Sequence, residues 1–237
     1  MSHVLKAVLF DVDGTLVDSN DAHAHAWVKA FADSGITVEF AHVRRCIGMG
    51  GDKLMPEVSG LKDDSPLGSQ IAKRRGEIFT TEFLPKIRPF RDAARLVATV
   101  KDLGLTAVAA SSAKKDELKP LLEIAGADGL MDAATSSDDA EESKPDPDII
   151  QAALKRAKAA PAEAIMIGDT PYDVEAALRA SVATIAFRSG GWSDADLAGA
   201  IAIYDGPWDL LEQLDQSPLR QSHRDARASQ YAAGKAD

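Results

Sequence analysis

Short hydrophobic runs alternate with longer amphipathic segments along most of this chain. The first run, residues 4–10, is partly β-branched and ends abruptly at Asp11, which predicts a buried strand. After residue 89 the alternation becomes regular, and it is typical of a doubly wound parallel α/β sheet. Further strands are predicted over residues 105–110, 129–134, 164–167, 182–187 and 200–204, and helices over residues 92–103, 116–125, 147–159 and 172–180.

Residues 19–86 interrupt this alternation, because they show helical periodicity and contain no predicted strand. We therefore expect two domains, a core of residues 1–17 and 87–216 and an inserted all-helical domain of residues 18–86. Few large apolar residues follow position 216, so residues 217–237 are predicted to form a loosely held polar tail. Helices are predicted over residues 20–34, 41–47, 53–58 and 67–83.

Composition narrows the class of protein. A formal net charge of -10 opposes nucleic acid and anionic membranes as partners, and no apolar run approaches the ~18 residues of a membrane helix. The single cysteine, Cys46, excludes an internal disulfide and is expected to be a small buried residue. The first residues lack the features of a signal peptide, so a cytoplasmic location is expected. The oligomeric state is left open.

Candidate chemistry begins directly after the first strand, in the string FDVDGTLVDS. Asp11 and Asp13 stand two residues apart, so in an extended segment their carboxylates project toward the same side. Such a pair repels itself unless a cation or a shared proton relieves it. Gly14 suits a tight turn or a close backbone approach. The alternative is a structural turn in which each aspartate satisfies nearby backbone N–H groups.

Polar residues also follow later strands, where ligands bind in sheets of this kind. Ser111 closes the run AVAAS, Lys144 lies in ESKPDPDI, and Asp169 and Asp173 lie in IMIGDTPYDVEAA. Together with FDVDGTLVDS, these segments occur in the order of the four motifs of haloacid dehalogenase superfamily phosphatases, which the chain resembles over nearly its whole length. The resemblance implies a Rossmann-like core with an inserted helical cap, and hinge segments at residues 17–20 and 85–89.

The resemblance also assigns roles to these residues. Asp11 is the expected nucleophile, which forms an aspartyl-phosphate, and Asp13 is the expected general acid and base. Mg²⁺ prefers oxygen ligands, and Asp11, Asp169 and the backbone carbonyl of Asp13 are the expected set, supported by Asp173. Lys144 and Ser111 are expected to act on the phosphoryl oxygens. Burial and neighbouring acidic groups are predicted to raise the pKa of Asp13.

The helical insert offers candidates for substrate binding. Gly50 lies in GMGG, residues 48–51, which is either a substrate loop or an ordinary turn between helices. We also expect substrate contacts from Lys53, from Ser112 and from His23. The segment DSNDAHAHAW around His23 resembles the β-phosphoglucomutase branch of the superfamily, although a helical histidine is more often structural. The basic cluster 73–75 on an amphipathic helix usually indicates a solvated face.

The sequence therefore predicts a Mg²⁺-dependent phosphatase, a phosphoric monoester hydrolase whose substrate is a small phosphorylated metabolite. Two alternatives stay open. A phosphomutase of the β-phosphoglucomutase type is disfavoured by Ile47 and Gly51, which stand where that branch carries a lysine and an arginine. A catalytically silent binding protein is disfavoured by the full set of motif residues, because a scaffold has no use for so much buried like charge.

Overall fold

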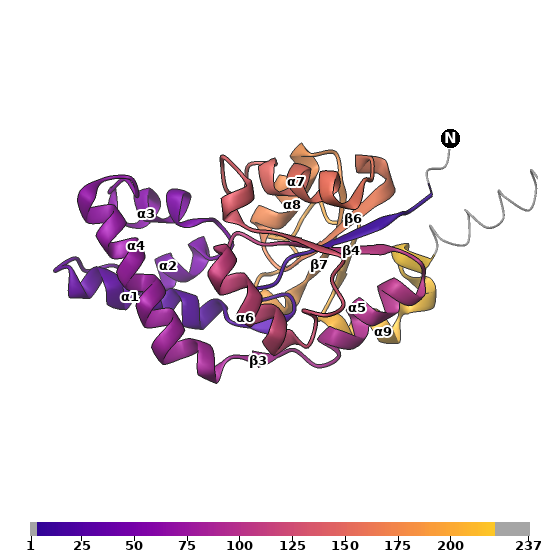
Figure 1. Cartoon of the computed structure of the whole chain (residues 1–237), viewed down its shortest axis with the longest axis horizontal. Helices are drawn as coiled ribbons and strands as arrows, with labels where there is room; N and C mark the ends of the chain where they lie inside the picture. Colours follow the sequence, from indigo (N-terminus) through magenta and orange to yellow (C-terminus); the bar gives the residue numbers. More distant parts are fainter. Residues whose placement is uncertain (1–3, 221–237) are drawn as a thin grey trace, which may run out of the picture.

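The computed structural model describes residues 4–220 and is built around a six-stranded parallel sheet (Figure 1). The strands lie in the order β5-β4-β1-β6-β7-β8, so the first strand of the chain occupies a central position. Every neighbouring pair in this sheet is parallel, as the sequence predicts. The strands are β1 (Ala7–Phe10), β4 (Thr106–Ala110), β5 (Ala133–Thr135), β6 (Ala164–Gly168), β7 (Ala183–Phe187) and β8 (Ala202–Tyr204).

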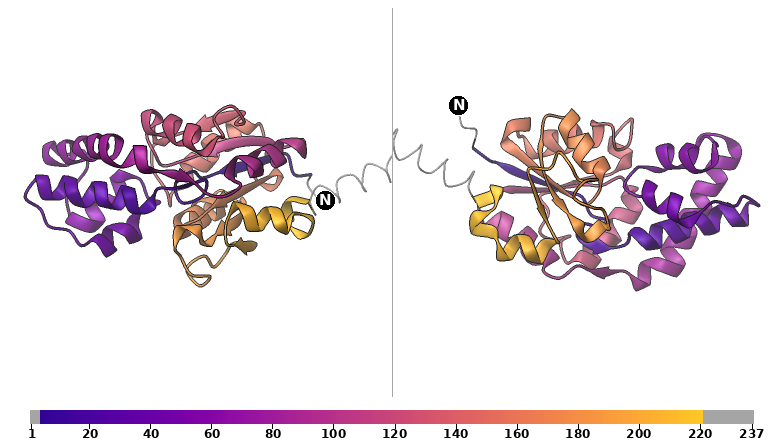
Figure 2. Two further views of the ribbon diagram at one scale, coloured as in Figure 1. Left: turned by 90° about the horizontal axis from the view of Figure 1, so that it is seen from below. Right: turned by 180° about the vertical axis from the view of Figure 1, so that it is seen from behind.

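Helices cover both faces of the sheet, because alternate residues of a strand point to opposite sides. In β1, Val8 and Phe10 join one hydrophobic cluster, whereas Ala7 and Leu9 join another on the opposite face. Figure 2 shows the resulting layers. One layer contains α5 (Ala93–Asp102), α6 (Lys115–Ala125) and α9 (Pro207–Glu212), and the other contains α7 (Asp148–Ala157) and α8 (Pro171–Arg179). Short 3-10 turns η3 (Ser137–Asp139), η4 (Pro161–Glu163), η5 (Arg188–Gly190) and η6 (Leu214–Gln216) complete the connections.

A helical layer, which we call the cap, stands beyond the carboxyl ends of the central strands (Figures 1 and 2). It joins the core through a two-stranded antiparallel ribbon of β2 (Val17–Asp18) and β3 (Arg88–Pro89), which the sequence analysis did not predict. The predicted fold class, a doubly wound core with an inserted helical cap, is confirmed. The cap contains α1 (Asn20–Asp33), α2 (Phe40–Cys46), α3 (Gly51–Ser59), α4 (Pro66–Ile78), η1 (Phe79–Phe83) and η2 (Leu84–Lys86).

Several boundaries differ from the sequence prediction. The first strand begins at Ala7 rather than at residue 4, and the last cap helix changes to a π-helical turn, η1, after Ile78. Ser217 and Leu219 are fully buried, so the first residues of the predicted tail pack against the core. The remainder of that tail, residues 221–237, lies outside the described residues. The proposed domain borders at 17/18 and 86/87 fall within or beside the β2–β3 ribbon and stay a prediction.

None of the helices between residues 4 and 220 is long and apolar enough to span a membrane. Cys46 is buried, as expected, and burial raises the pKa of its thiol to about 11.

Candidate active site

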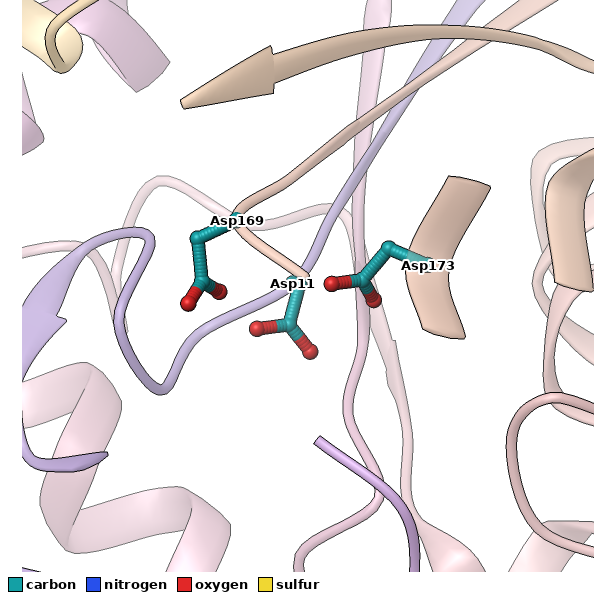
Figure 3. A group of neighbouring side chains, drawn as sticks. All are labelled: Asp11, Asp169 and Asp173. Carbon is teal, nitrogen blue, oxygen red and sulfur yellow. The ribbon is translucent and has the colours of Figure 1, made fainter. Parts of the chain in front are cut away.

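The predicted chemical residues meet where three central strands end. Asp11 directly follows β1, Ser111 follows β4 and Asp169 follows β6. The sheet order places β4 and β6 on either side of β1, so these strand ends are neighbours. Asp173, in the first turn of α8, points toward the same space (Figure 3). The fold therefore brings together side chains that lie up to 162 positions apart, from Asp11 to Asp173 (173 − 11).

Three of these side chains form a buried carboxylate cluster. Oxygen atoms of Asp11, Asp169 and Asp173 lie within 4.8 Å of one another, and all three residues are buried. Burial and the neighbouring carboxylates raise the pKa of Asp11 well above its usual value, although Lys144 opposes this shift. Burial and the charge of Asp173 likewise raise the pKa of Asp169 to about 7. The cluster thus holds more negative charge than its surroundings balance.

Lys144 is the one ammonium group that we find within this cluster in the described chain. Its Nζ donates to Asp11 Oδ1 and to Asp173 Oδ1, each at 2.7 Å, and to the carbonyl oxygen of Ala110 at 2.8 Å. The side chain is 1% exposed. Burial alone would lower the pKa of Lys144, but the two carboxylates outweigh it and raise the pKa, so the group is charged at neutral pH.

The hydrogen bonds of the cluster distinguish the carboxylate that supports the site from those that could bind a metal ion. Asp173 has both oxygens engaged, Oδ1 by Lys144 and Oδ2 by the N–H and hydroxyl of Thr170. Asp169 is oriented by the hydroxyl of Thr15 and the amide of Asn20, each at 2.9 Å. Three carboxylates and one ammonium group leave an excess of negative charge. A divalent cation that prefers oxygen ligands would neutralise this excess. The donor set therefore fits Mg²⁺, with Asp11 and Asp169 as the carboxylates best placed to bind it.

Asp13 corrects one prediction. Burial does act to raise the pKa of its carboxyl group, but His23, Ser19 and Arg75 outweigh burial and lower it. The Oδ1 atom of Asp13 receives the Ser19 hydroxyl at 2.5 Å and lies 2.8 Å from His23 Nε2. The prediction rested on burial and on the acidic neighbours in sequence, whereas the histidine and the arginine that lower this pKa reach the carboxylate from the cap.

The other predicted residues are distributed around the same strand ends. Ser111 is 1% exposed, and its hydroxyl accepts a hydrogen bond from the N–H of Ala113 at 3.0 Å. The Ser112 hydroxyl lies 3.3 Å from the carbonyl oxygen of Gly48, and the Gly50 N–H donates to Ser143 Oγ at 3.1 Å. The GMGG loop therefore bridges from the cap to the loops that follow β4 and η3.

A cavity of about 900 Å³ lies between cap and core beside this loop. Its lining includes Gly50, Ser112 and Arg75, whereas His23 and Lys53 are not among the lining residues. His23 instead contacts Asp13, and Lys53 is paired with Glu142 and with Asp146, the latter at 3.2 Å. The structure thus brings Gly50 and Ser112 to the cavity and leaves Lys53 as a tether between cap and core.

Sequence reasoning missed the residues that hold the carboxylates in place. Thr15 and Asn20 orient Asp169, and Ser19 orients Asp13. All three belong to the continuous string DGTLVDSN, so its hydroxyl and amide side chains were the available indication. The basic cluster 73–75 divides: Arg74 is exposed and pairs with Asp33, as a solvated face predicts, but Arg75 is largely buried.

Gly14 is required for the position of Asp169. Its φ is +76°, and an added Cβ would come within 2.1 Å of Asp169 Oδ2 and 2.2 Å of Asn20 Nδ2. We expect Gly14→Ala to displace Asp169, to lower kcat/KM by at least ~100-fold and to destabilise the protein by more than the ~1–2 kcal/mol of a left-handed alanine. Enzyme kinetics and urea unfolding measure both effects.

Gly104 provides the matched control for this substitution. It has the same φ of +76°, but an added Cβ meets no atom within 4 Å. Gly104→Ala should therefore show the backbone strain without loss of activity. Equal activity losses in the two variants would contradict a specific role of Gly14 beside Asp169.

Comparisons with known proteins agree with this geometry. A family model described as haloacid dehalogenase-like hydrolase matches residues 8–187. The chain therefore belongs to the haloacid dehalogenase-like hydrolases. The predicted enzyme class, a phosphoric monoester hydrolase of this superfamily, is confirmed at the level of the class.

The individual relatives share about a third or less of their aligned residues with this chain. The chain is 33% identical over 189 residues to Protein SUPPRESSOR OF QUENCHING 1, chloroplastic, of Arabidopsis thaliana, a match that covers 78% of this chain but 18% of that protein. It is 28% identical over 185 residues to Phosphoglycolate phosphatase of Aquifex aeolicus, which covers 76% and 83% of the two chains. A crystal structure of a hydrolase from Pseudomonas syringae superimposes with a TM-score of 0.83 at 29% identity, covering 89% of this chain and 98% of that one.

Proposed function

We propose that this protein is a Mg²⁺-dependent phosphatase that hydrolyses small phosphorylated metabolites through an aspartyl-phosphate on Asp11. The observation that carries the proposal is the buried arrangement of Asp11, Asp169 and Lys144 at the strand ends. The residue after Ser111 and the residue before Lys144, Ser112 and Ser143, line the cavity between cap and core. Phosphoryl transfer depends mainly on positioning and on stabilising charge, and this arrangement supplies both.

In the first half-reaction, a carboxylate oxygen of Asp11 attacks the phosphorus atom and the bond from phosphorus to the leaving oxygen breaks. Asp13 must first take up a proton, because its lowered pKa favours the ionised form in the free protein, and it then gives that proton to the leaving oxygen. In the second half-reaction, water attacks the phosphorus atom, Asp13 takes a proton from the water, and the bond from phosphorus to Asp11 breaks. Inorganic phosphate is released and both aspartates return to their starting states.

The remaining residues stabilise the negative charge of the phosphoryl group. Lys144 restrains Asp11 and neutralises part of the charge on the phosphoryl oxygens, and the Ser111 hydroxyl donates to one of those oxygens. Asp11, Asp169 and the carbonyl of Asp13 would hold Mg²⁺. The bound ion would reduce the repulsion between the negative phosphoryl group and the attacking carboxylate. Asp173 supports the site through Lys144. Gly50 and Ser112, which line the cavity, contact the rest of the substrate in this proposal.

We expect inorganic phosphate to be released from a panel of sugar phosphates, phosphoglycolate, nucleotides and p-nitrophenyl phosphate with Mg²⁺ present, and release to stop when a chelator removes the ion. Colorimetric phosphate detection over the panel ranks the substrates. No release from any compound, with or without Mg²⁺, would contradict the phosphatase proposal. Isomerisation of a sugar phosphate that requires a bisphosphate activator would favour the phosphomutase instead.

A further inference from the structure

A chain of four side chains leaves the core, passes through the cap and returns to the core. It starts at Glu117 in the first turn of α6, crosses to Arg75 in α4, continues to His23 in α1 and ends at Asp13. Arg75 Nη1 lies 2.6 and 2.7 Å from the two carboxylate oxygens of Glu117. Arg75 Nη2 lies 3.1 Å from His23 Nδ1, and His23 Nε2 lies 2.8 Å from Asp13 Oδ1.

The direction of these hydrogen bonds follows from the donors available. A guanidinium group only donates, so His23 Nδ1 must accept from Arg75 and carries no proton. The proton of the neutral imidazole is then on Nε2, which donates to Asp13 Oδ1. Arg75 therefore selects the one neutral tautomer of His23 that can hold the carboxylate of Asp13.

The same hydrogen bonds distinguish the two oxygens of Asp13. Within residues 4–220, the hydrogen bonds that we find to this carboxylate, from Ser19 and from His23, both arrive at Oδ1. Oδ2 is thereby left to carry the proton that passes to the leaving oxygen. A carboxylate held by one oxygen has a fixed direction for the other, which is what a general acid requires.

Glu117 holds the far end of the chain. Its side chain is 8% exposed and that of Arg75 is 16% exposed, so the ion pair is largely desolvated. The position of Glu117 in the first turn of α6 also favours its negative charge. In the cap, Phe79 packs against both His23 and Arg75. The centroid of its ring lies 4.0 Å from that of the stacked His23 ring and 5.5 Å from the guanidinium carbon of Arg75. The guanidinium is fixed by Glu117 and Phe79 rather than by solvent.

We infer that Glu117 is a positioning residue for the general acid: it holds Arg75 so that His23 aims Asp13 at the leaving group only when the cap is docked on the core. This inference rests on the proposed function, because it concerns the proton that Asp13 supplies. It assigns to a core helix outside the four sequence motifs a part in coupling cap docking to proton transfer.

The test uses Glu117→Gln and two substrates whose leaving groups differ in their need for a proton. An alkyl phosphate such as β-glycerophosphate requires protonation of its leaving oxygen, whereas p-nitrophenolate departs without it. We measure kcat/KM, which reports the first half-reaction and is insensitive to the later hydrolysis of the phosphoenzyme. We expect a fall of ~30-fold or more for the alkyl phosphate and of less than ~3-fold for p-nitrophenyl phosphate.

Glu123→Gln is the matched control, because it makes the same change on the same helix at an exposed ion pair with Lys119. Both of its rate constants should equal those of the wild type. Arg75→Gln removes the next side chain of this series and should reproduce the selective loss. It also tests the inference if Glu117→Gln proves unstable. Equal losses on both substrates in these variants would overturn the inference and indicate a purely structural ion pair. Wild-type protein inactive on both substrates would instead contradict the proposed function itself.

Discussion

Replacing Asp11 by asparagine is expected to abolish phosphate release while the protein stays folded. The amide keeps the size of the side chain but cannot form the acyl-phosphate, so kcat should fall by at least ~1000-fold. The fold should tolerate the change, because Asp11 is one of three carboxylates in a cluster with excess negative charge. Since burial and like charges raise the pKa of Asp11, its ionised form costs folding free energy, and the neutral amide removes that cost.

Two measurements separate these effects. Phosphate release and acid trapping of a phosphoenzyme from labelled substrate follow the chemistry, and urea unfolding without Mg²⁺ follows stability. The raised pKa gives the sign of the pH effect: the wild type should lose stability as the pH rises above the unfolded pKa of Asp11 toward its folded pKa, and Asp11→Asn should lose less. A variant that still forms phosphoenzyme would show that another residue is the nucleophile.

Replacing Lys144 by alanine is expected to damage both stability and activity. The substitution leaves Asp11 and Asp173 buried without the ammonium group that contacts both. Removing one partner of a buried ion pair costs about 3–5 kcal/mol, and this site loses two such contacts. Activity should be lost as well, since the nucleophile and the phosphoryl oxygens lose their fixed positive charge.

The loss of stability should depend on pH in a defined direction. Without Lys144 the carboxylates hold their protons to still higher pH, so the difference from the wild type should be small at low pH and grow as the pH rises through the range where Asp11 and Asp169 ionise, the latter with a pKa of about 7 in the wild type. Urea unfolding at about pH 5 and about pH 8 measures it. Lys155→Ala, an exposed lysine of α7, is the control and should change stability by no more than about 0.5 kcal/mol. A pH-independent difference would contradict the charge argument.

The sequence predicted the parts of this protein that local pattern controls. Short continuous hydrophobic runs indicate parallel strands that are buried on both faces, and a hydrophobic period of 3.6 residues indicates the helices that cover them. The rule that ligands bind at the carboxyl ends of strands then placed Asp11, Ser111 and Asp169 at one end of the sheet, where they lie in the structure. Where the hydrophobic pattern was weak, as in the short strand Ala133–Thr135 and the hinge ribbon, the bounds were wrong or the element was missed.

Tertiary structure alone decided which charges face one another. The lowered pKa of Asp13 depends on His23 and Arg75, 10 and 62 positions away along the chain (23 − 13 and 75 − 13), which reach it only because the cap docks on the core. Arg75 was indistinguishable in sequence from its neighbour Arg74, yet one is largely buried against Glu117 and the other is exposed. Electrostatic interactions act through space, and the distances and solvent exposure of the charged groups are fixed only when the chain folds. Hydrophobic periodicity, in contrast, is a property of consecutive residues and can be read from the sequence itself.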